Sequence, residues 1–559
     1  MAADYVDGLL EIKRNEFQTS NFEKVCQRYT AREVMMPVRD GVRLHTWIYL
    51  PNTGEDKYPV ILTRSCYPNE DRLYHFYGEE FALRGYVFIF QYVRGRELSE
   101  GNWEPNIHER EDGLDAVNWI ISQPWCKKLG YWGLSYLSMA GWAMADLVEG
   151  KVAAMYLEHY GTDRYRSAYE HGAFRHDVLT AWSMENAGEN PQADYLESCR
   201  FMPHIKVDET LWGKKVPSYQ EYITNPKRED MLWQAGWWHT LREIPRRTKI
   251  PLCLVSGWYD HHHSSAMATW EKLNEEAKKH SRLEIGGWGH FFQDCLEGKK
   301  TENLNAGNIK KILQWFQMTL AEERLPAQEV RFYRIGEDGW HTCKCWETGA
   351  VSYRTFFPGD PVSTNVGNLR ENQWGKESVY SYEYDPHRPV TTISGEGLLH
   401  STDKIGIRRQ PQPGWRQDVI SFVSEPLKEA LSIQGKIRVE LEVSTDCEDT
   451  AFTAAVMEVS EGKAYNIRSS VATIGENGEY HPGERRTVVI EMWDIAYKLP
   501  EGSRIRLDIS SSDFPKYNIH SNYSGLWSMQ NKTRKASQKV FTGGDCCTKL
   551  LLPVIQNHS

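Results

Sequence analysis

The sequence of 559 residues has no long apolar run, no excess of positive charge and no secretory signal. A membrane-spanning helix needs about 20 consecutive apolar residues. The longest apolar stretches here, near 85–93 and 550–555, have the length of a strand. The net charge of −10 disfavours a dedicated nucleic-acid-binding protein, because such proteins carry a basic stripe. The N-terminus also lacks a basic start followed by an apolar core. These absences predict a cytoplasmic protein that binds neither membrane nor nucleic acid.

The eleven cysteines have no framework spacing, and their number is odd. This pattern favours reduced thiols in a cytoplasmic protein over a disulfide scaffold. His341, Cys343 and Cys345 could ligate a metal, but no second cluster of matching spacing accompanies them. Packing thiols are therefore the better interpretation, and we expect no metal and no cofactor.

From Met35 onward, strand-like and helix-like segments alternate. Residues 58–63 and 86–90 are short, continuously apolar runs, which are typical of strands covered on both faces. Helices are expected over 73–84, which precedes Gly85, and over 109–123, which precedes Pro124. This alternation predicts an α/β fold with a parallel sheet.

A helical segment rich in aromatic residues interrupts the alternation of strands and helices. After the alternation ends, the sequence pattern changes. After Pro326 the sequence shows short alternating strands such as 330–333, separated by Gly, Pro, Asn and Asp, which predict an all-β sandwich or jelly roll. The expected organisation is an N-terminal extension (1–34), an α/β-hydrolase-like catalytic domain (35–160 and 245–326), an inserted helical cap (161–244) and a C-terminal jelly-roll domain (327–559).

The sharpest local motif is Gly-Tyr-Trp-Gly-Leu-Ser-Tyr-Leu-Ser at 130–138. A strand that enters a Gly-x-Ser turn and continues into a helix is the setting of a nucleophile elbow, which exposes a serine hydroxyl above a sheet. Leu137 replaces the last glycine of the usual Gly-x-Ser-x-Gly motif. By itself, the motif leaves Ser135 open as either a nucleophile or a helix cap.

Two further residues complete the order serine, acid, histidine that this fold uses. Asp260 follows the expected strand 253–257, and His290 follows the next expected strand, 282–285. Either residue alone would more often be structural. Three such residues at strand ends, in this order, favour a catalytic triad.

At this point the sequence resembles the α/β-hydrolase family of cocaine esterase, α-amino-acid ester hydrolases and X-Pro dipeptidyl-peptidases. The resemblance covers nearly the whole chain. Its marks are Pro37–Val42, Arg94-Gly95 with Ser99-Glu100-Gly101, Trp125-Cys126, Gly133-x-Ser135-Tyr136, Gly257–Asp260, Trp288-x-His290 and Leu551–Ile555.

The resemblance implies two donors for an oxyanion hole: the hydroxyl of Tyr67, after the first core strand, and the backbone N–H of Tyr136. It also implies the same three-part architecture. Ser138 stands where the family has a glycine, and its small size should still allow close helix packing. Tyr92 stands where the family commonly has an aspartate, which puts only local loop contacts in doubt.

The third departure from the family follows the triad acid. Amino-acid ester hydrolases carry acidic residues there that hold a substrate ammonium, whereas this chain has His261-His262-His263. Consecutive side chains diverge, so a metal site is disfavoured. Either His262 and His263 line the substrate pocket or the three are solvated loop residues. If solvated, they would gain charge near pH 6 and repel an ammonium.

Cap residues Tyr169, Glu170 and Trp182 are further candidates for the substrate pocket, and Glu170 could replace the missing ammonium-binding acid. The resulting hypothesis is a serine hydrolase that forms an acyl-enzyme, namely a carboxylic-ester hydrolase with a hydrophobic or aromatic acyl pocket. The alternatives are an X-Pro dipeptidyl-peptidase or amino-acid ester hydrolase, an acyltransferase, and a non-catalytic binding protein. The expected partner is a small ester or amide, and a homo-oligomer is compatible with the sequence.

Overall fold

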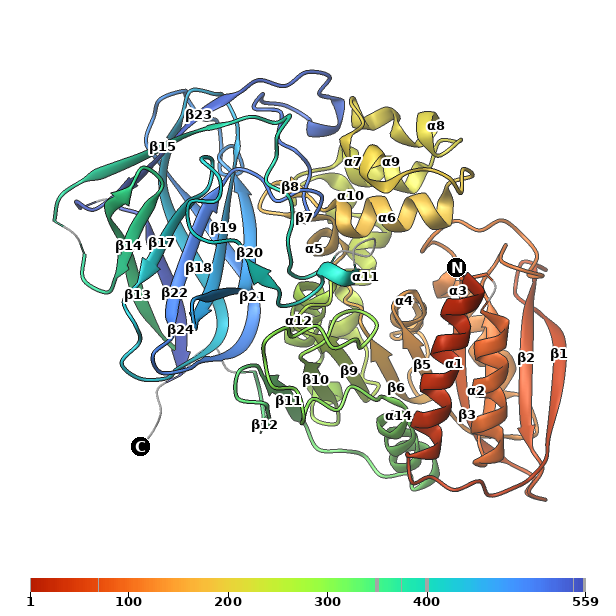
Figure 1. Ribbon diagram of the computed structural model, residues 1–559. Helices are drawn as coiled ribbons and strands as arrows, with labels where there is room; N and C mark the ends of the chain where they lie inside the picture. The colour runs from red at the N-terminus through yellow and green to blue at the C-terminus, as the bar shows by residue number, and fades with distance from the viewer. Residues whose placement is uncertain are drawn as a thin grey trace.

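The computed structural model describes residues 2–68, 70–346, 351–373, 375–397, 402–545 and 547–555. Its N-terminal part is built on one ten-stranded sheet (Figure 1). The strand order is β1 (Tyr29–Pro37), β2 (Arg43–Pro51), β4 (Val87–Tyr92), β3 (Tyr58–Ser65), β5 (Cys126–Leu134), β6 (Val152–Glu158), β9 (Leu252–Gly257), β10 (Arg282–Gly286), β11 (Glu329–Arg334) and β12 (Gly339–Cys343).

The strands from β4 to β11 are parallel, and the pairings at both edges are antiparallel. Every residue of β4 and β9 is buried, which explains why both strands begin with a continuous apolar run, 87–90 in β4 and 252–255 in β9. The predicted α/β sheet is therefore confirmed. Its carboxyl ends meet at one edge, where α/β proteins place their ligands.

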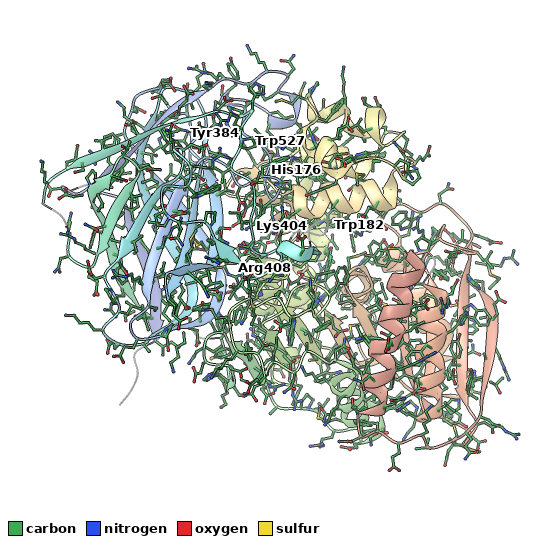
Figure 2. All side chains as sticks on the ribbon, viewed as in Figure 1. His176, Trp182, Tyr384, Lys404, Arg408 and Trp527 are labelled. Atoms are coloured by element: carbon green, nitrogen blue, oxygen red, sulfur yellow. The ribbon has the colours of Figure 1, made fainter. Side chains whose placement is uncertain are left out.

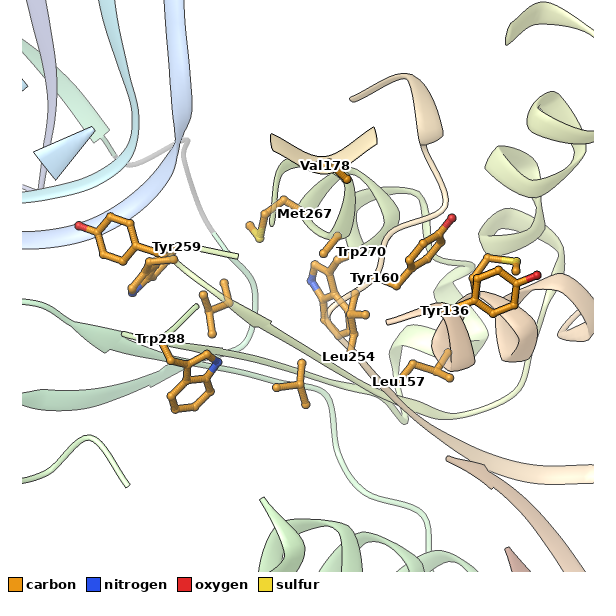
Figure 3. Close-up of a cluster of buried hydrophobic side chains, with 14 of the residues drawn as sticks. Tyr136, Leu157, Tyr160, Val178, Leu254, Tyr259, Met267, Trp270 and Trp288 are labelled. Atoms are coloured by element: carbon orange, nitrogen blue, oxygen red, sulfur yellow. The ribbon is translucent and has the colours of Figure 1, made fainter. Parts of the chain in front are cut away.

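Helices pack in two groups that the contacts define. One group is α1 (Ala2–Gln18), α2 (Asp71–Leu83) and α14 (Ile309–Phe316), the last continued by a π-helical turn at Gln317–Ala321. The other is α3 (Glu109–Ile121), α4 (Tyr136–Met144), α11 (Gly236–Arg247) and α12 (His263–Lys272), with the short α13 (Glu275–Lys278). A buried cluster runs along β6 and β9 and includes Tyr136, Leu157, Tyr160, Leu254 and Trp288 (Figure 3).

Between β6 and β9 the chain forms a mostly helical cap, drawn in yellow in Figure 1 beside the β-rich part. Its elements are α5 (Arg164–Ala168), the hairpin β7 (Tyr169–Glu170) and β8 (Ala173–Phe174), α6 (His176–Ala187), α7 (Tyr195–Arg200), η1 (His204–Lys206), α8 (Val207–Leu211), α9 (Pro217–Thr224), α10 (Met231–Gln234) and α11.

The C-terminal part is a sandwich of two β-sheets. One contains β15 (Ser378–Tyr384), β23 (Ala536–Thr542), β18 (Leu431–Thr445), β24 (Lys549–Ile555), β13 (Val351–Ser363) and β21 (Arg486–Leu499). The other contains β14 (Val366–Arg370), β17 (Ile420–Ser424), β22 (Arg504–Ser510), β19 (Ala451–Ser460), β20 (Lys463–Thr473) and β16 (Arg409–Gln410). Two short helical turns, η3 (Thr402–Lys404) and η4 (Trp527–Met529), lie between these strands in the chain. Strand β13 also pairs with β14 and so joins the two sheets.

One strand assignment from the sequence is wrong. Residues 330–333 were expected to belong to the sandwich, but they form β11, which pairs in parallel with β10 of the catalytic sheet. The alternation of a short strand shows which face is buried and does not show which sheet it joins. No helix within the described residues is long and apolar enough to cross a membrane.

Candidate active site

Ser135 lies at the sharp turn between β5 and α4, with φ 57° and ψ −121°. Such a left-handed conformation is strained for a residue with a side chain, so the surrounding structure must hold it. The Ser135 N–H donates to the carbonyl oxygen of Glu158 at 2.9 Å. A Cβ atom on Gly133 would lie 2.4 Å from the carbonyl carbon of Leu137, so this position of the turn requires glycine.

Ser138 takes the place of the family's second glycine, and it is fully buried. Its hydroxyl oxygen lies 2.8 Å from the N–H of Glu158 and 2.7 Å from the carbonyl oxygen of the same residue. The hydroxyl therefore ties the first turn of α4 to the end of β6. This departure from the family pattern adds a polar contact directly beneath the elbow.

Asp260 follows β9, His290 follows β10, and the structure brings their side chains together. The Nδ1 of His290 lies 2.7 Å from Oδ1 of Asp260, and both side chains are buried. Burial alone would raise the pKa of the Asp260 carboxyl, but His290 and His159 hold this pKa well below its usual range. An ionised carboxylate only accepts hydrogen bonds. Nδ1 therefore carries the proton, and Nε2 of His290 is left as the acceptor.

Tyr67 follows β3; its hydroxyl accepts a hydrogen bond from Trp182 at 3.2 Å and lies close to the side chain of Ser135. Burial raises the pKa of Tyr67 far above its usual range, so the phenol keeps its proton. Tyr136 is the first residue of α4, where backbone N–H groups have no partner within the helix. The two sequence-predicted oxyanion donors are thus a protonated phenol close to Ser135 and the backbone N–H of the next residue in the chain.

The side chain of Tyr136 is anchored by groups that the sequence did not single out. Its hydroxyl donates to Oε1 of Glu109 and accepts from the backbone N–H of Asn106 at 2.9 Å. Burial raises the pKa of Glu109 to about 7, against the lowering effect of the Tyr136 hydrogen bond. The second oxygen, Oε2, is buried without a hydrogen-bond partner among the described residues.

We expect Glu109→Gln to stabilise the protein at alkaline pH. The folded-state pKa of about 7 exceeds the ordinary 4.5, so the folded protein binds the extra proton between these values. The contribution of this group to stability is fully present below pH 4.5 and is lost as the pH rises from 4.5 through 7, by at most about 3 kcal/mol. Glutamine keeps the acceptor for Tyr136 and cannot ionise. Calorimetry should show a higher Tm than wild type at pH 8.5 and little difference at pH 5. An equal change in Tm at both pH values would contradict this account.

His159, directly after β6, is a second buried histidine beside the Asp260–His290 pair, and the sequence did not indicate it. Its Nδ1 donates to the backbone carbonyl of His290, and its ring packs on Phe292 at 4.3 Å. Burial lowers its pKa to about 4, so the ring is neutral and its Nε2 is an acceptor. Neither this Nε2 nor Oδ2 of Asp260 has a hydrogen-bond partner within the described ranges.

His159, Asp260 and His290 also form the one group of three potential metal ligands found in the described part of the chain. One ligand atom of each lies within 4.8 Å of the others. The three consecutive histidines 261–263 do not provide this group between them. Two of its three members are the predicted acid and base of the triad.

The three consecutive histidines are buried, so their interpretation as solvated loop residues is wrong. The ring of His261 stacks on the ring of His290 at 4.0 Å, and Nδ1 of His262 lies 2.9 Å from the Ser167 hydroxyl. Burial lowers the pKa of His261 and of His262 well below the usual range. The expectation that they gain charge near pH 6 is therefore also wrong, because desolvation disfavours the charged form.

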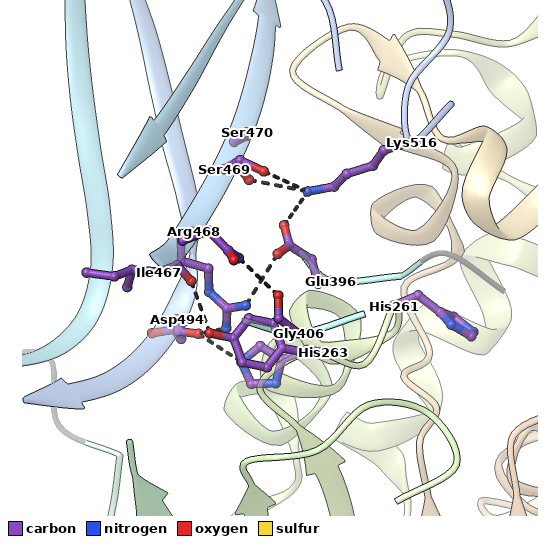
Figure 4. A network of polar contacts seen from close by, with 12 residues as sticks. His261, His263, Glu396, Gly406, Ile467, Arg468, Ser469, Ser470, Asp494 and Lys516 are labelled. Atoms are coloured by element: carbon purple, nitrogen blue, oxygen red, sulfur yellow. Dashed lines mark hydrogen bonds and ion pairs between the residues drawn. The ribbon is translucent and has the colours of Figure 1, made fainter. Parts of the chain in front are cut away.

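His263 does not face the catalytic pair. Its Nδ1 lies 3.1 Å from the hydroxyl of Ser256 and its Nε2 lies 3.2 Å from the backbone oxygen of Asp494. It belongs to a polar network at the contact with the β-sandwich, which also contains Arg468 (Figure 4). Both ring nitrogens are engaged there, so neither is left to bind a substrate, and these contacts do not support its assignment to the substrate pocket.

The cap residues that the sequence suggested for the substrate pocket also differ from one another in their surroundings. Trp182 stacks on Tyr136 at 5.9 Å and donates to the Tyr67 hydroxyl at 3.2 Å, and Figure 2 shows it at the lower edge of the cap. Glu170 is buried and accepts from Ser470 and, at 2.7 Å, from Tyr517. Its oxygens are held by the β-sandwich, so it is not available as a free ammonium-binding acid.

Tyr169 is a packing residue. Its hydroxyl donates to the carbonyl of Tyr222 at 2.9 Å and accepts from Trp527 at 3.1 Å. Its ring lies against Tyr165 and Phe174. These contacts hold Tyr169 between the cap and Trp527 of the C-terminal part, and they do not support its assignment to the pocket.

A strained serine after β5, with an aspartate–histidine pair at the ends of later parallel strands, defines a serine hydrolase of the α/β-hydrolase fold. Comparisons with known families agree. Residues 40–292 match the X-Pro dipeptidyl-peptidase (S15) family, and residues 324–550 match the X-Pro dipeptidyl-peptidase C-terminal non-catalytic domain. The chain therefore belongs to the α/β-hydrolase family of cocaine esterase, α-amino-acid ester hydrolases and X-Pro dipeptidyl-peptidases, as its resemblance predicted.

Individual relatives cover almost the whole chain. Cocaine esterase of Rhodococcus sp. (strain MB1 Bresler) is 26% identical over 94% of this chain and 98% of its own length. Among solved structures, an α-amino acid ester hydrolase has a TM-score of 0.81 at 20% identity, covering 96% of this chain and 97% of that one. An aminopeptidase from the marine sediment archaeon Thaumarchaeota archaeon has a TM-score of 0.80 at 19% identity, covering 96% and 98%. At these identities, the structural similarity shows the fold.

Proposed function

We propose that this serine hydrolase cleaves neutral carboxylic esters, with Ser135, His290 and Asp260 as its catalytic triad. The hydroxyl of Ser135 attacks the ester carbonyl and its proton passes to Nε2 of His290. The tetrahedral intermediate then releases the alcohol, which takes that proton from His290. Water attacks the remaining acyl-enzyme by the same route and releases the acid. Asp260 orients the imidazole and stabilises its charged form.

The oxyanion is stabilised by the hydroxyl of Tyr67 and the backbone N–H of Tyr136. The raised pKa of Tyr67 supports this role, because a phenol that keeps its proton remains a donor throughout the reaction. The contact of Tyr67 with Ser135 supports the placement of this donor beside the reacting carbonyl. Trp182 adds an apolar surface next to it, suited to a hydrophobic or aromatic acyl group.

The preference for a neutral substrate rests on one observation, the buried and uncharged state of His261 and His262 beside the triad. A substrate ammonium placed there would lose its hydration without meeting a carboxylate, which is unfavourable. Glu170, the acid expected to serve it, is held by Ser470 and Tyr517. The names of the relatives include both an esterase and enzymes of amino-acid derivatives, and the lack of a free carboxylate beside His261 and His262 supports the esterase alternative for this chain.

The test compares kcat/KM for a neutral phenyl ester, an α-amino phenyl ester of similar size and an X-Pro p-nitroanilide. We expect kcat/KM for the neutral ester to exceed kcat/KM for the amino ester by at least about tenfold. The free energy needed to desolvate an ammonium without a charged partner is larger than the free energy that corresponds to a tenfold change in kcat/KM. The ratio should widen from pH 8 to pH 6, because an α-amino group, whose ordinary pKa is about 7.7, gains its charge over this range while burial keeps His261 and His262 neutral. If the amino ester or the X-Pro substrate is preferred, the proposed ester specificity is wrong.

A further inference from the structure

Two consecutive phenylalanines follow His290, and they differ in their surroundings. Phe292 packs against His159 at 4.3 Å and Trp288 at 5.3 Å. Phe291 is 44% exposed, and the edge of its ring contacts the His290 ring at 5.1 Å with an interplanar angle of 79°. A large aromatic side chain is thus presented to solvent directly beside the imidazole of the candidate triad.

The loop that carries Phe291 is held in place. The backbone N–H of Phe291 donates to the side-chain oxygen of Gln293 at 2.9 Å, and that of Phe292 donates to the carbonyl of Gly289 at 3.2 Å. His159 binds the carbonyl of His290 from beneath. The backbone that carries the exposed ring is therefore held beside His290, and the ring itself contacts the His290 imidazole.

Single exposed apolar residues are common and need no function. Phe291 differs from such residues in its position, because the reaction requires the leaving group of the substrate to lie next to His290. The departing oxygen receives its proton from Nε2 of His290, so it has to be within hydrogen-bond distance of that atom. Tyr67 and Trp182 lie together on the oxyanion side of Ser135, joined by their own hydrogen bond. A flat group attached to the departing oxygen would meet Phe291.

We propose that Phe291 is a specificity-determining residue that binds the leaving group, and that it favours esters of planar apolar alcohols such as phenols and benzylic alcohols. This inference rests on the proposed ester hydrolysis and specifies its second substrate group. A planar ring can pack against the exposed phenylalanine ring, whereas a methoxide or ethoxide leaving group is too small to cover it.

The experiment uses butyrate esters that share one acyl group and differ in the alcohol: phenyl, 2-naphthyl, methyl and ethyl. We compare the full-length wild-type protein with Phe291→Ala. The matched control is Tyr353→Ala, which removes a half-exposed ring from the β-sandwich. For Phe291→Ala we expect kcat/KM to fall about three- to tenfold for the aryl esters and less than twofold for the alkyl esters. Because the wild-type protein and the variant are compared on the same ester, differences in the intrinsic reactivity of the leaving groups cancel.

The deacylation rate provides the second measurement. All four esters give the same butyryl-enzyme after the alcohol has left, so the steady-state rate after the burst should be unchanged in Phe291→Ala. Equal losses for aryl and alkyl esters would show that Phe291 acts on His290, and no loss for any ester would make it an ordinary surface residue. A changed deacylation rate would place it on the acyl side. Each of these three results overturns the proposal.

Failure of the proposed function gives a different result. If amino-acid or X-Pro substrates are preferred over neutral esters, the proposed specificity for neutral esters is wrong. The ratio of kcat/KM for aryl and alkyl esters can then still be measured with the preferred acyl group. Phe291→Ala should reduce that ratio by the same factor, because the leaving group lies next to His290 in either case. An unchanged ratio on the preferred acyl group overturns the assignment of Phe291.

Discussion

Ser135→Ala should lower kcat for a neutral ester by a factor of about 10⁶, the loss typical of removing the nucleophile from a serine triad. The variant retains the groups around the carbonyl, namely the Tyr67 hydroxyl, the Tyr136 N–H and His290. Only the atom that forms the acyl-enzyme is removed, so the residual rate is that of water attack assisted by the remaining site. Steady-state kinetics and labelling with a fluorophosphonate measure the effect, because the probe reacts only with an activated serine.

Folding should be unaffected by this substitution. The Ser135 side chain is half-buried at the tip of the turn, and the contact that holds the turn to β6 uses its backbone N–H. Alanine adopts the strained φ at a similar cost, so the Tm should change little. Labelling of Ser135→Ala at the wild-type rate, or activity above about 1% of wild type, would show that another residue is the nucleophile.

The sequence predicted the catalytic sheet and the elbow because both depend on short-range patterns. Apolar runs bounded by turn signals identify buried strands, and a Gly-x-Ser turn between a strand and a helix identifies an elbow. The positions of Asp260 and His290 followed from the same logic, since each ends a predicted strand. Their contact at 2.7 Å is a consequence of parallel strands that end at one edge of the sheet.

Contacts between distant segments could not be predicted. Glu109 begins a helix that looked ordinary, yet its carboxyl anchors Tyr136, 27 positions later. His159 directly follows a strand, and its bond to the His290 carbonyl joins residues 131 positions apart. Neither pairing leaves a periodic signal in the sequence. The same limitation explains β11, because a short alternating strand does not indicate which sheet it will join.

The histidine run illustrates how burial changes the meaning of a residue type. From the sequence, three adjacent imidazoles suggested solvated groups that titrate near pH 6, or pocket residues. In the structure they are buried and divide into different roles: His261 stacks on His290, whereas His263 belongs to the contact with the β-sandwich. Burial lowers the pKa of His263 to about 3, which keeps the ring neutral within that network. Charge at these positions therefore could not be read from residue type alone.

Tyr67→Phe should lower kcat by about 10²–10³ and change KM much less. The substitution removes one hydroxyl and keeps the ring, so the loss falls on the oxyanion that forms in the transition state. The measurement must report acylation, either as kcat for an alkyl ester whose slow acylation limits the rate or as the rate of the pre-steady-state burst with an aryl ester. The effect should also be seen in the rate of fluorophosphonate labelling, since that reaction builds negative charge on an oxygen in the same place.

Trp182 complicates this test and also provides its control. Its indole N–H donates to the Tyr67 hydroxyl at 3.2 Å, so Tyr67→Phe leaves that donor without its acceptor and could disturb the cap. Trp182→Phe breaks the same hydrogen bond but retains the Tyr67 hydroxyl. If the hydroxyl stabilises the oxyanion, Trp182→Phe should reduce kcat less than about tenfold, mainly through packing, while Tyr67→Phe produces the full loss. Equal losses in the two variants would assign the effect to the contact between cap and catalytic domain, and Tyr67 would no longer be a donor to the oxyanion.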